Sequence, residues 1–356
     1  MAKAKMLMKG NYAIAEAAIR AGCTFFAGYP ITPQSEIPEY MSSRMPEAGG
    51  TFVQTESEIA GISMVYGAAA CGFRAMTSSS GPGFSLMQEG ISYMASAEVP
   101  AVIVDVTRYG SGLGDIFPSQ GDYLQLAKNG GHGDYRCVIL APGNLQEAVD
   151  FMEEAFEIAE KYRNPVIMAC DGSIAQMVEA VDFPEQSKKQ DPDRFDWAIK
   201  HHRENLRKTF CPPFYYDITL EESDSLVRQK FERMSECEAR WEEFYTEDAE
   251  VILATYGTTS RICKEAVLKA RSQGLKLGLI RPKTLWPFPK LPFEKVAPKA
   301  FLSVEMCVIP QMVEDVALAA RGRIPVYTYA TGSSYPETGD VIAKAKEVLS
   351  GKLEEV

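Results

Sequence analysis

Short apolar runs alternate with longer stretches of mixed polarity over the first 180 residues. Because the apolar runs lack the every-second-residue alternation of half-exposed strands, they are typical of a parallel sheet covered by helices on both faces. We predict strands at residues 24–29, 50–55, 74–79, 101–108, 136–142 and 165–172. We predict helices at residues 11–22, 33–45, 57–72, 83–97 and 144–163. The alternation of the two indicates an α/β fold.

The pattern breaks at about residue 181 and resumes at about residue 249. The segment between is polar and interrupted by prolines, and it ends in a charge-rich stretch at 222–245 that predicts a helix. Beyond it we predict strands at 250–257, 275–283, 300–306 and 325–330, separated by helices. We therefore expect two parallel-sheet domains, at residues 1–180 and 249–356, joined by a linker with a helix at 181–248.

Composition narrows the possible functions. The 356 residues are 46% hydrophobic and 24% charged, with a net charge of −11, which argues against a nucleic-acid partner because phosphate binding needs a basic face. No apolar run approaches the roughly 20 residues of a membrane span. The basic start MAKAKMLMKGN lacks a signal-peptide core, so we expect a cytoplasmic protein.

The cysteines and histidines predict no metal chemistry within this chain. The eight cysteines include no C-x-x-C pair, and the three histidines show no ligand spacing. We therefore expect neither an iron–sulfur cluster nor a zinc site here, and we interpret most of the cysteines as small buried apolar residues.

Unusual residues follow the first four predicted strands. These strands end in GYPITP, QTESE, TSSSGPG and VTRYGSG, and ligands of open parallel sheets bind beyond the carboxyl ends of the strands. Each loop also has a simpler explanation, because glycine and proline mark turns and Thr55-x-x-Glu58 fits a helix capping box. Four such loops on one edge nevertheless favour one pocket, lined by Thr32, Glu58, Ser79, Ser80 and Arg108.

The predicted pocket lacks a phosphate-binding motif of its own. The chain contains neither a G-x-x-x-x-G-K-[ST] loop nor a G-x-G-x-x-G fingerprint. Cys170-Asp171-Gly172 is faintly similar to a metal–diphosphate motif, but without its leading glycine we interpret Asp171 as a helix cap. A pocket edge without phosphate or metal ligands suggests half of a shared site.

Four motifs resemble the alpha subunit of 2-oxoacid:ferredoxin oxidoreductases, thiamine-diphosphate enzymes built from several chains. The motifs are Tyr29–Pro33 (YPITP), Gln54–Glu58 (QTESE), Thr77–Gly83 (TSSSGPG) and Arg281–Phe288 (RPKTLWPF), and the resemblance spans nearly the whole chain in order. It implies a pyrimidine-binding domain followed by a transketolase C-terminal-like domain.

The resemblance also implies residue roles. Glu58 matches the glutamate that activates the cofactor, Thr32 the threonine that contacts substrate, and Arg108 the arginine that meets the substrate carboxylate. A glutamate at pyrimidine N1′ promotes the imino tautomer, and a guanidinium suits a planar carboxylate. The prolines beside Thr32 would hold it preorganised. The remaining expected cofactor-binding residues are Tyr29, Pro30, Ile31, Ser79, Ser80 and Gly81.

Partner chains and substrate follow from the same resemblance. It implies a beta subunit that holds Mg²⁺, the diphosphate and a [4Fe–4S] cluster, and a ferredoxin-like gamma or delta subunit with further clusters. The expected reaction converts a 2-oxo acid and coenzyme A to acyl-CoA and CO₂ while ferredoxin is reduced. Ser119–Tyr123 (SQGDY) and Gly130–Arg136 (GGHGDYR) most resemble the branched-chain type, which acts on 2-oxoisovalerate (3-methyl-2-oxobutanoate).

Other interpretations stay open. The 2-oxoglutarate type is the near neighbour, and a transketolase-like subunit without ferredoxin or a non-catalytic scaffold are rivals from other classes. Ile309-Pro310-Gln311-Met312 departs from the family's Gly-Gln-Met turn, which puts a subunit contact in question. The loop Tyr109–Gly114 is also altered, which leaves substrate gating open there.

Overall fold

The first sheet has seven strands and carries the motifs of the N-terminal half. In the computed structural model, which describes residues 5–185, 191–199 and 218–356, its strand order is β12-β6-β7-β5-β4-β2-β3, and all neighbours are parallel except β12 and β6. Its strands are β2 (Phe25–Gly28), β3 (Thr51–Gln54), β4 (Ala75–Ser79), β5 (Val102–Thr107), β6 (Val138–Leu140), β7 (Val166–Asp171) and β12 (Thr284–Trp286).

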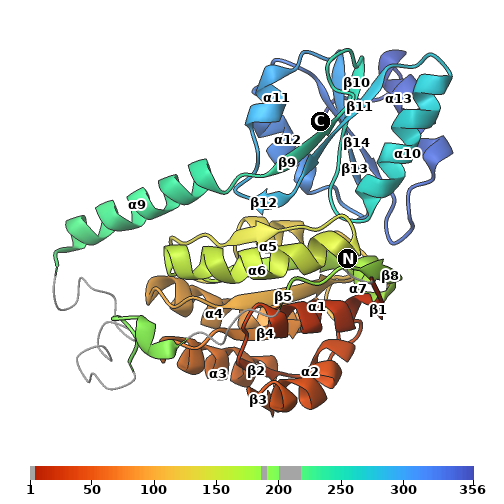
Figure 1. The fold of residues 1–356 in the computed structure, drawn as a ribbon. Helices are drawn as coiled ribbons and strands as arrows, with labels where there is room; N and C mark the ends of the chain where they lie inside the picture. The colour runs from red at the N-terminus through yellow and green to blue at the C-terminus, as the bar shows by residue number, and fades with distance from the viewer. Residues whose placement is uncertain (1–4, 186–190, 200–217) are drawn as a thin grey trace.

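Helices cover both faces of this sheet, as continuous apolar strands require. One face packs against α1 (Gly10–Arg20), α2 (Glu36–Glu47) and α6 (Leu145–Tyr162), and the other against α3 (Glu58–Ala70), α4 (Pro82–Ser96) and α5 (Tyr123–Ala127). A small antiparallel ribbon of β1 (Met6–Lys9) and β8 (Val178–Val181) adjoins α7 (Gly172–Gln176). Figure 1 shows this half below the second sheet.

The second sheet has the order β14-β13-β10-β11-β9, with only β9 antiparallel to its neighbour. Helices α10 and α13 pack together on one face, and α11 and α12 lie on the other. The bounds are β9 (Trp241–Phe244), β10 (Val251–Ala254), α10 (Thr259–Ser272), β11 (Leu277–Pro282), α11 (Leu291–Lys295), β13 (Ala300–Glu305), α12 (Met312–Ala320), β14 (Val326–Ala330) and α13 (Thr338–Leu349). Both predicted parallel sheets are therefore confirmed.

Two strands depart from the prediction. The helix expected at 222–245 is α9 (Leu220–Cys237), which projects from the body in Figure 1, and β9 follows it as an edge strand. Within the RPKTLWPF motif, β12 leaves the second half of the chain and pairs with β6 of the first sheet. The boundaries at 180 and 248 stay a prediction, but these strands tie the linker and the C-terminal part into both sheets.

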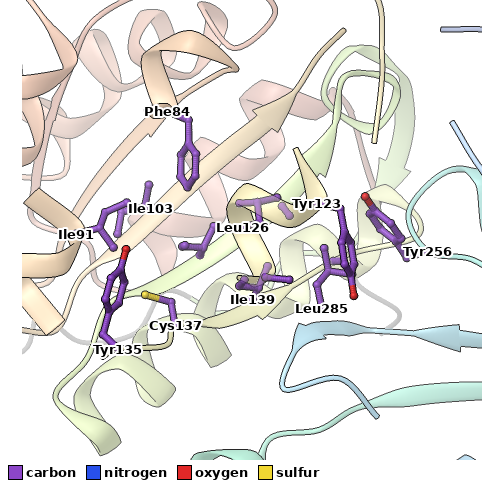
Figure 2. Close-up of a cluster of buried hydrophobic side chains, with 14 of the residues drawn as sticks. Phe84, Ile91, Ile103, Tyr123, Leu126, Tyr135, Cys137, Ile139, Tyr256 and Leu285 are labelled. Atoms are coloured by element: carbon purple, nitrogen blue, oxygen red, sulfur yellow. The ribbon is translucent and has the colours of Figure 1, made fainter. Parts of the chain in front are cut away.

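One hydrophobic cluster runs through both halves. Figure 2 shows Phe84 and Ile103 of the first half in the same cluster as Tyr256 and Leu285 of the second. The rings of Tyr123 and Tyr256 lie 5.8 Å apart between centroids. Because the apolar contact is continuous, we expect the two sheets to move as one unit.

The segment 119–124 hydrogen bonds to the second half of the chain mainly through Gln120, which is fully buried. The backbone N–H of Gln120 donates to the Met306 carbonyl at 2.7 Å, and its side-chain amide nitrogen donates to the Tyr256 carbonyl at 2.9 Å. Its side-chain oxygen accepts from the Met306 N–H at 2.9 Å and from the Thr259 hydroxyl at 3.1 Å. All polar atoms of this side chain are thus used between the two halves.

A second glutamine, in the C-terminal half, hydrogen bonds back to the first half of the chain. Gln311, just before α12, donates to the Gly121 carbonyl at 2.7 Å and accepts from the Leu124 N–H at 2.8 Å. The Tyr123 hydroxyl donates to Asp315 of α12 at 2.6 Å. The turn at 309–312, which departs from the family pattern, therefore contacts the first half of the same chain through Gln311.

A buried ion pair adds to this interface. Arg281 of β11 is 2% exposed and donates to both carboxylate oxygens of Glu147 on α6, at 2.8 and 2.6 Å. Burial raises the pKa of Glu147, but the hydrogen bonds and charge of Arg281 outweigh it and lower that pKa to about 2. Because the folded pKa is depressed, this contribution to stability is full above the ordinary glutamate pKa of about 4.3 and is lost as the pH falls towards 2.

Candidate active site

The loops after β2, β3, β4 and β5 meet at the carboxyl edge of the first sheet. Parallel neighbours place these strand ends side by side, because β2 pairs with β3 and β4, and β4 pairs with β5. The nine predicted site residues all lie on these loops or at their borders. The structure brings Glu58 to Ser79, and Arg108 to Thr32.

Side-chain amides hydrogen bond to the backbone carbonyls of the YPITP loop. The amide nitrogens of Asn11 and Gln176 both donate to the Pro33 carbonyl at 2.7 Å. Gln34 donates to the Tyr29 carbonyl at 3.0 Å and accepts from the Ser78 hydroxyl at 2.6 Å.

The upper surface of this loop stays accessible. Tyr29, Pro30 and Thr32 are exposed, and Ile31 is half-buried. The loop is therefore fixed in place while the predicted binding residues at its tip remain open to a ligand.

Glu58 is buried although it begins a helix. It is 5% exposed, and its Oε1 accepts a hydrogen bond from the Ser79 hydroxyl at 3.2 Å. The capping-box explanation is wrong, because the N-cap of α3 is Ser57, which accepts from the Ala60 N–H, while Thr55 donates to the Ser57 carbonyl. Glu58 is thus the first residue of α3 rather than the third, and its carboxylate points into the loop after β4.

The turn Gly81–Gly83 bridges the two parts of the site. A β-carbon on Gly83 would lie 2.1 Å from Oε1 of Glu58 and 2.3 Å from the hydroxyl oxygen of Ser79, so a larger residue would displace these side chains. Gly81 has a φ of +48°, a conformation that other residues rarely adopt, and a β-carbon on it would lie 3.1 Å from Nε of Arg108. Glu58 and Arg108 therefore lie on two sides of one short turn.

Arg108 is 6% exposed at the end of β5, and its hydrogen bonds leave donors free. Nη1 donates to the Thr32 carbonyl at 2.7 Å, and Nη2 donates to the Leu113 carbonyl at 2.8 Å. Nε of Arg108 and the hydroxyl of Ser80 are buried without a hydrogen-bond partner. Buried unpaired donors are costly, and they are expected where a ligand is to bind.

Two carboxylates beside Arg108 were not among the predicted site residues. Asp105 is fully buried in β5, and Asp122 lies in the segment that the second half of the chain holds. Burial raises the pKa of Asp105 well above its ordinary value, and the charge of Asp122 raises it further. Burial also raises the pKa of Asp122 to about 6. A charged residue inside the otherwise apolar run AVIVDVT was the sequence signal that could have revealed Asp105.

The two motifs that pointed to the branched-chain type contact other parts of the protein. Ser119 and Gln120 both hydrogen bond to Met306. In GGHGDYR, the Gly130 N–H donates to the side chain of Gln88 on α4, and the Gly131 N–H donates to the Tyr135 hydroxyl. Their hydrogen bonds connect the first motif to the second half of the chain and the second motif to α4.

The predicted helix-capping role of Asp171 is confirmed. Its carboxylate accepts from the Ser173 and Ile174 N–H groups at the start of α7. It also accepts from the backbone and the hydroxyl of Thr258, both at 2.7 Å, which links it to the start of α10.

Neither a metal cluster nor a membrane helix is found in the described part of the chain. Over residues 5–185, 191–199 and 218–356, no three His, Cys, Asp or Glu side chains gather in a way that could hold a metal ion. Within the same ranges, every helix is too short or too polar to cross a bilayer.

Family comparison defines the class of the protein. Residues 16–245 match the thiamine-diphosphate-binding domain of pyruvate flavodoxin/ferredoxin oxidoreductases, and residues 249–340 match core domain II of pyruvate:ferredoxin oxidoreductase. The chain belongs to the 2-oxoacid:ferredoxin oxidoreductase family, as its motifs indicated. These enzymes are oxidoreductases that use thiamine diphosphate and iron–sulfur clusters in complexes of several subunits.

Individual relatives are similar over almost the whole chain. The ketoisovalerate oxidoreductase subunit VorB of Methanothermobacter thermautotrophicus is 47% identical over 347 residues, which cover 97% of this chain and 98% of that one. The 2-oxoglutarate synthase subunit KorA of Methanocaldococcus jannaschii is 40% identical. The match covers 96% of this chain and 93% of KorA.

Solved structures agree with this fold. The 2-oxoglutarate:ferredoxin oxidoreductase of Magnetococcus marinus matches with a TM-score of 0.84 and 26% identity over 97% of this chain and 65% of that chain. A split-gene transketolase matches with a TM-score of 0.60 over 97% of this chain and 99% of that chain. Its sequence identity of 15% shows a shared fold alone.

Gly83→Ala tests the close approach at the turn. We expect the new methyl group to displace Glu58 or the start of α4 and to lower the free energy of unfolding by about 1–3 kcal/mol. Gly67→Ala in α3 is the matched control, because its β-carbon meets nothing within 4 Å, and it should be neutral or stabilise by up to about 1 kcal/mol. Denaturant unfolding of the two variants measures the difference; equal stabilities would contradict the described geometry.

Proposed function

We propose that this chain supplies the pyrimidine-side half of the thiamine-diphosphate site in a 2-oxoisovalerate:ferredoxin oxidoreductase. The complex would convert 2-oxoisovalerate and coenzyme A to the branched acyl-CoA and CO₂ and pass two electrons to ferredoxin. The arrangement of Glu58 and Arg108 on two sides of the Gly81–Gly83 turn supports this most strongly, since it places a buried acid and a buried cation within one site.

The residues present fit the cofactor and the substrate in separate places. Glu58 would hydrogen bond to pyrimidine N1′, and the unpaired hydroxyl of Ser80 offers a further polar contact. Thiamine diphosphate supplies, when bound, the carbon nucleophile that adds to the 2-oxo group. The other residues we propose for cofactor contact are Tyr29, Pro30, Ile31, Ser79 and Gly81.

The substrate side of the site is formed by Arg108 and Thr32. Arg108 would bind the 2-oxo-acid carboxylate with Nε and its remaining N–H groups, because a charge-assisted, bidentate contact suits that planar group. The exposed Thr32 hydroxyl, on a loop held by Gln34 and Asn11, would then contact the same substrate. Burial around Arg108 strengthens this contact by excluding water.

The missing half of the site would come from a partner chain. Beside Glu58, helices α3 and α4 expose large apolar side chains: Ile59, Met64, Leu86 and Tyr93, which are 43–57% exposed. An exposed apolar face next to an incomplete site is typical of a protein interface. We propose that a beta subunit covers it and holds Mg²⁺, the diphosphate and a [4Fe–4S] cluster, while a ferredoxin-like gamma or delta subunit carries electrons onward.

The cysteines favour a reducing compartment. All seven described cysteines are free, and most are buried. Disulfides persist in oxidising compartments and are rare in the cytosol. This supports the proposal that the complex works in the cytoplasm.

Similarity supports the branched-chain substrate over its alternative. The two VorB subunits, named for ketoisovalerate, are 47% identical to this chain, whereas the KorA subunits, named for 2-oxoglutarate, are 35–40% identical. A 2-oxoglutarate oxidoreductase remains the second candidate, because one KorA subunit reaches 40% identity.

Substrate comparison tests this choice. With the partner chains present, coenzyme A-dependent reduction of ferredoxin should show a higher kcat/KM for 2-oxoisovalerate than for 2-oxoglutarate or pyruvate. The matched control is the same complex without coenzyme A, which should show no sustained turnover. A tenfold preference for 2-oxoglutarate, equal to about 1.4 kcal/mol, would overturn the branched-chain assignment.

Glu58→Gln tests the proposed acid. Glutamine keeps the size of the side chain but cannot share a proton with the cofactor, so turnover should fall roughly 10²–10⁴-fold. Exchange of the C2 hydrogen of bound thiamine diphosphate should slow as well, while the unfolding temperature of the complex stays unchanged. Glu56→Gln, at an exposed glutamate of the same segment, is the control and should behave as the wild type. Normal C2 exchange in Glu58→Gln would remove Glu58 from the catalytic role.

A further inference from the structure

Asp105, Asp122 and Arg108 form a group of charges behind the substrate side of the site. Both carboxylate oxygens of Asp105, Oδ2 of Asp122 and Nε of Arg108 are buried without a hydrogen bond of normal geometry. The guanidinium of Arg108 hydrogen bonds to the carbonyls of Thr32 and Leu113, which carry no net charge. The two carboxylates therefore act on Arg108 through their charge.

Two different parts of the fold position the two carboxylates. Asp105 lies in β5, which is buried along its whole length between β4 and β7. Asp122 is held between Gly121 and Tyr123, whose carbonyl and hydroxyl bond to Gln311 and Asp315. Asp105 is fully buried and Asp122 is half-buried, with its Oδ2 shielded from solvent.

Two such carboxylates cannot both be ionised at low cost. Burial and the charge of Asp122 raise the pKa of Asp105 well above its ordinary range, which favours a proton on Asp105. Burial raises the pKa of Asp122 to about 6, although the backbone and charge of Arg108 act in the opposite direction. A pair that shares one proton keeps a single negative charge, which balances the charge of Arg108.

The other titratable groups around the pair do not take over this role. Cys170 on the neighbouring strand β7 feels the charge of Asp105 from the opposite face of the sheet, and burial raises its thiol pKa well above the ordinary value, so it stays neutral. Tyr256, after β10, faces Asp122 and also stays neutral, because burial raises its pKa. The carboxylate of Asp171 is occupied by the donors of Thr258 and α7.

The reaction changes the charge next to Arg108 twice. An arriving 2-oxo acid adds one carboxylate, so that two negative charges would face one buried cation. When the carbon–carbon bond breaks, CO₂ leaves as a neutral molecule, and the bonding electron pair stays with the carbon that it left. The negative charge that had paired with Arg108 is then gone.

We propose that Asp105 and Asp122 form a proton-holding pair that takes up a proton when the substrate carboxylate binds Arg108 and releases it once CO₂ has left. This inference rests on the proposed function, because it requires that Arg108 meets the substrate. Asp122 is the member that changes charge, and it acts on substrate through Arg108 as a positioning residue. The proton comes from solvent on binding and returns to solvent, so the pair is unchanged after each turnover.

The pH dependence of the assembled complex tests the pair. Uptake of a proton on binding requires kcat/KM for the 2-oxo acid to fall as the pH rises above about 6, approaching tenfold per pH unit, while kcat changes much less. Asp122→Asn should remove this fall and leave kcat/KM level from pH 6 to 8. Asp150→Asn, at an exposed aspartate of α6, should keep the wild-type profile.

Calorimetry provides a readout that does not depend on turnover or on a variant. Titration of the wild-type complex with 2-hydroxy-3-methylbutanoate at pH 7, in two buffers of different ionisation enthalpy, should reveal uptake of about half a proton or more per site. A level wild-type kcat/KM profile together with no proton uptake would overturn the proposal. An Asp122→Asn profile identical to that of the wild type would also overturn it.

Arg108→Met separates this inference from the function on which it rests. The variant should lower kcat/KM for the 2-oxo acid at least about 30-fold. If it does so while the wild type shows no proton uptake, the proton-holding pair fails and the proposed role of Arg108 stands. If Arg108→Met leaves kcat/KM unchanged, both the role of Arg108 and the pair are wrong.

Discussion

The approach of the Gly81–Gly83 turn to Glu58 is the constraint on which the site depends. Gly83 leaves no room for a side chain beside the Glu58 carboxylate, and Gly81 brings the same turn against Arg108. A buried acid and a buried cation are thereby brought against one short stretch of backbone. Such preorganisation means that little rearrangement is needed when ligands arrive.

The second half of the chain takes part in holding the substrate side. The segment 119–124, which follows the loop after Arg108, hydrogen bonds to the second half of the chain through Gln120 and Gln311. Asp122 lies within that held segment and faces Arg108, so the interface between the sheets reaches the proposed carboxylate site. The C-terminal half therefore supports the candidate site from the other sheet.

Much of this arrangement could be predicted, because the apolar strands and the loops after them follow local rules. The meeting of the four loops at one edge needed only strand order, whereas the role of Glu58 came from the family resemblance and stays a prediction. The crossing of β12 into the first sheet could not be predicted, since three residues carry no signal of which sheet they join. Likewise, SQGDY reads as a motif of a substrate type, but only the folded structure shows Gln120 binding the second sheet.

A structure of the assembled complex with thiamine diphosphate and an unreactive 2-oxo-acid analogue would test the central claim most directly. The account predicts the analogue's carboxylate at about 3 Å from the guanidinium nitrogens of Arg108. It also predicts the pyrimidine ring of the cofactor against Glu58, on the other side of the Gly81–Gly83 turn. An analogue whose carboxylate is bound by the partner chain alone, with no contact to Arg108, would contradict it.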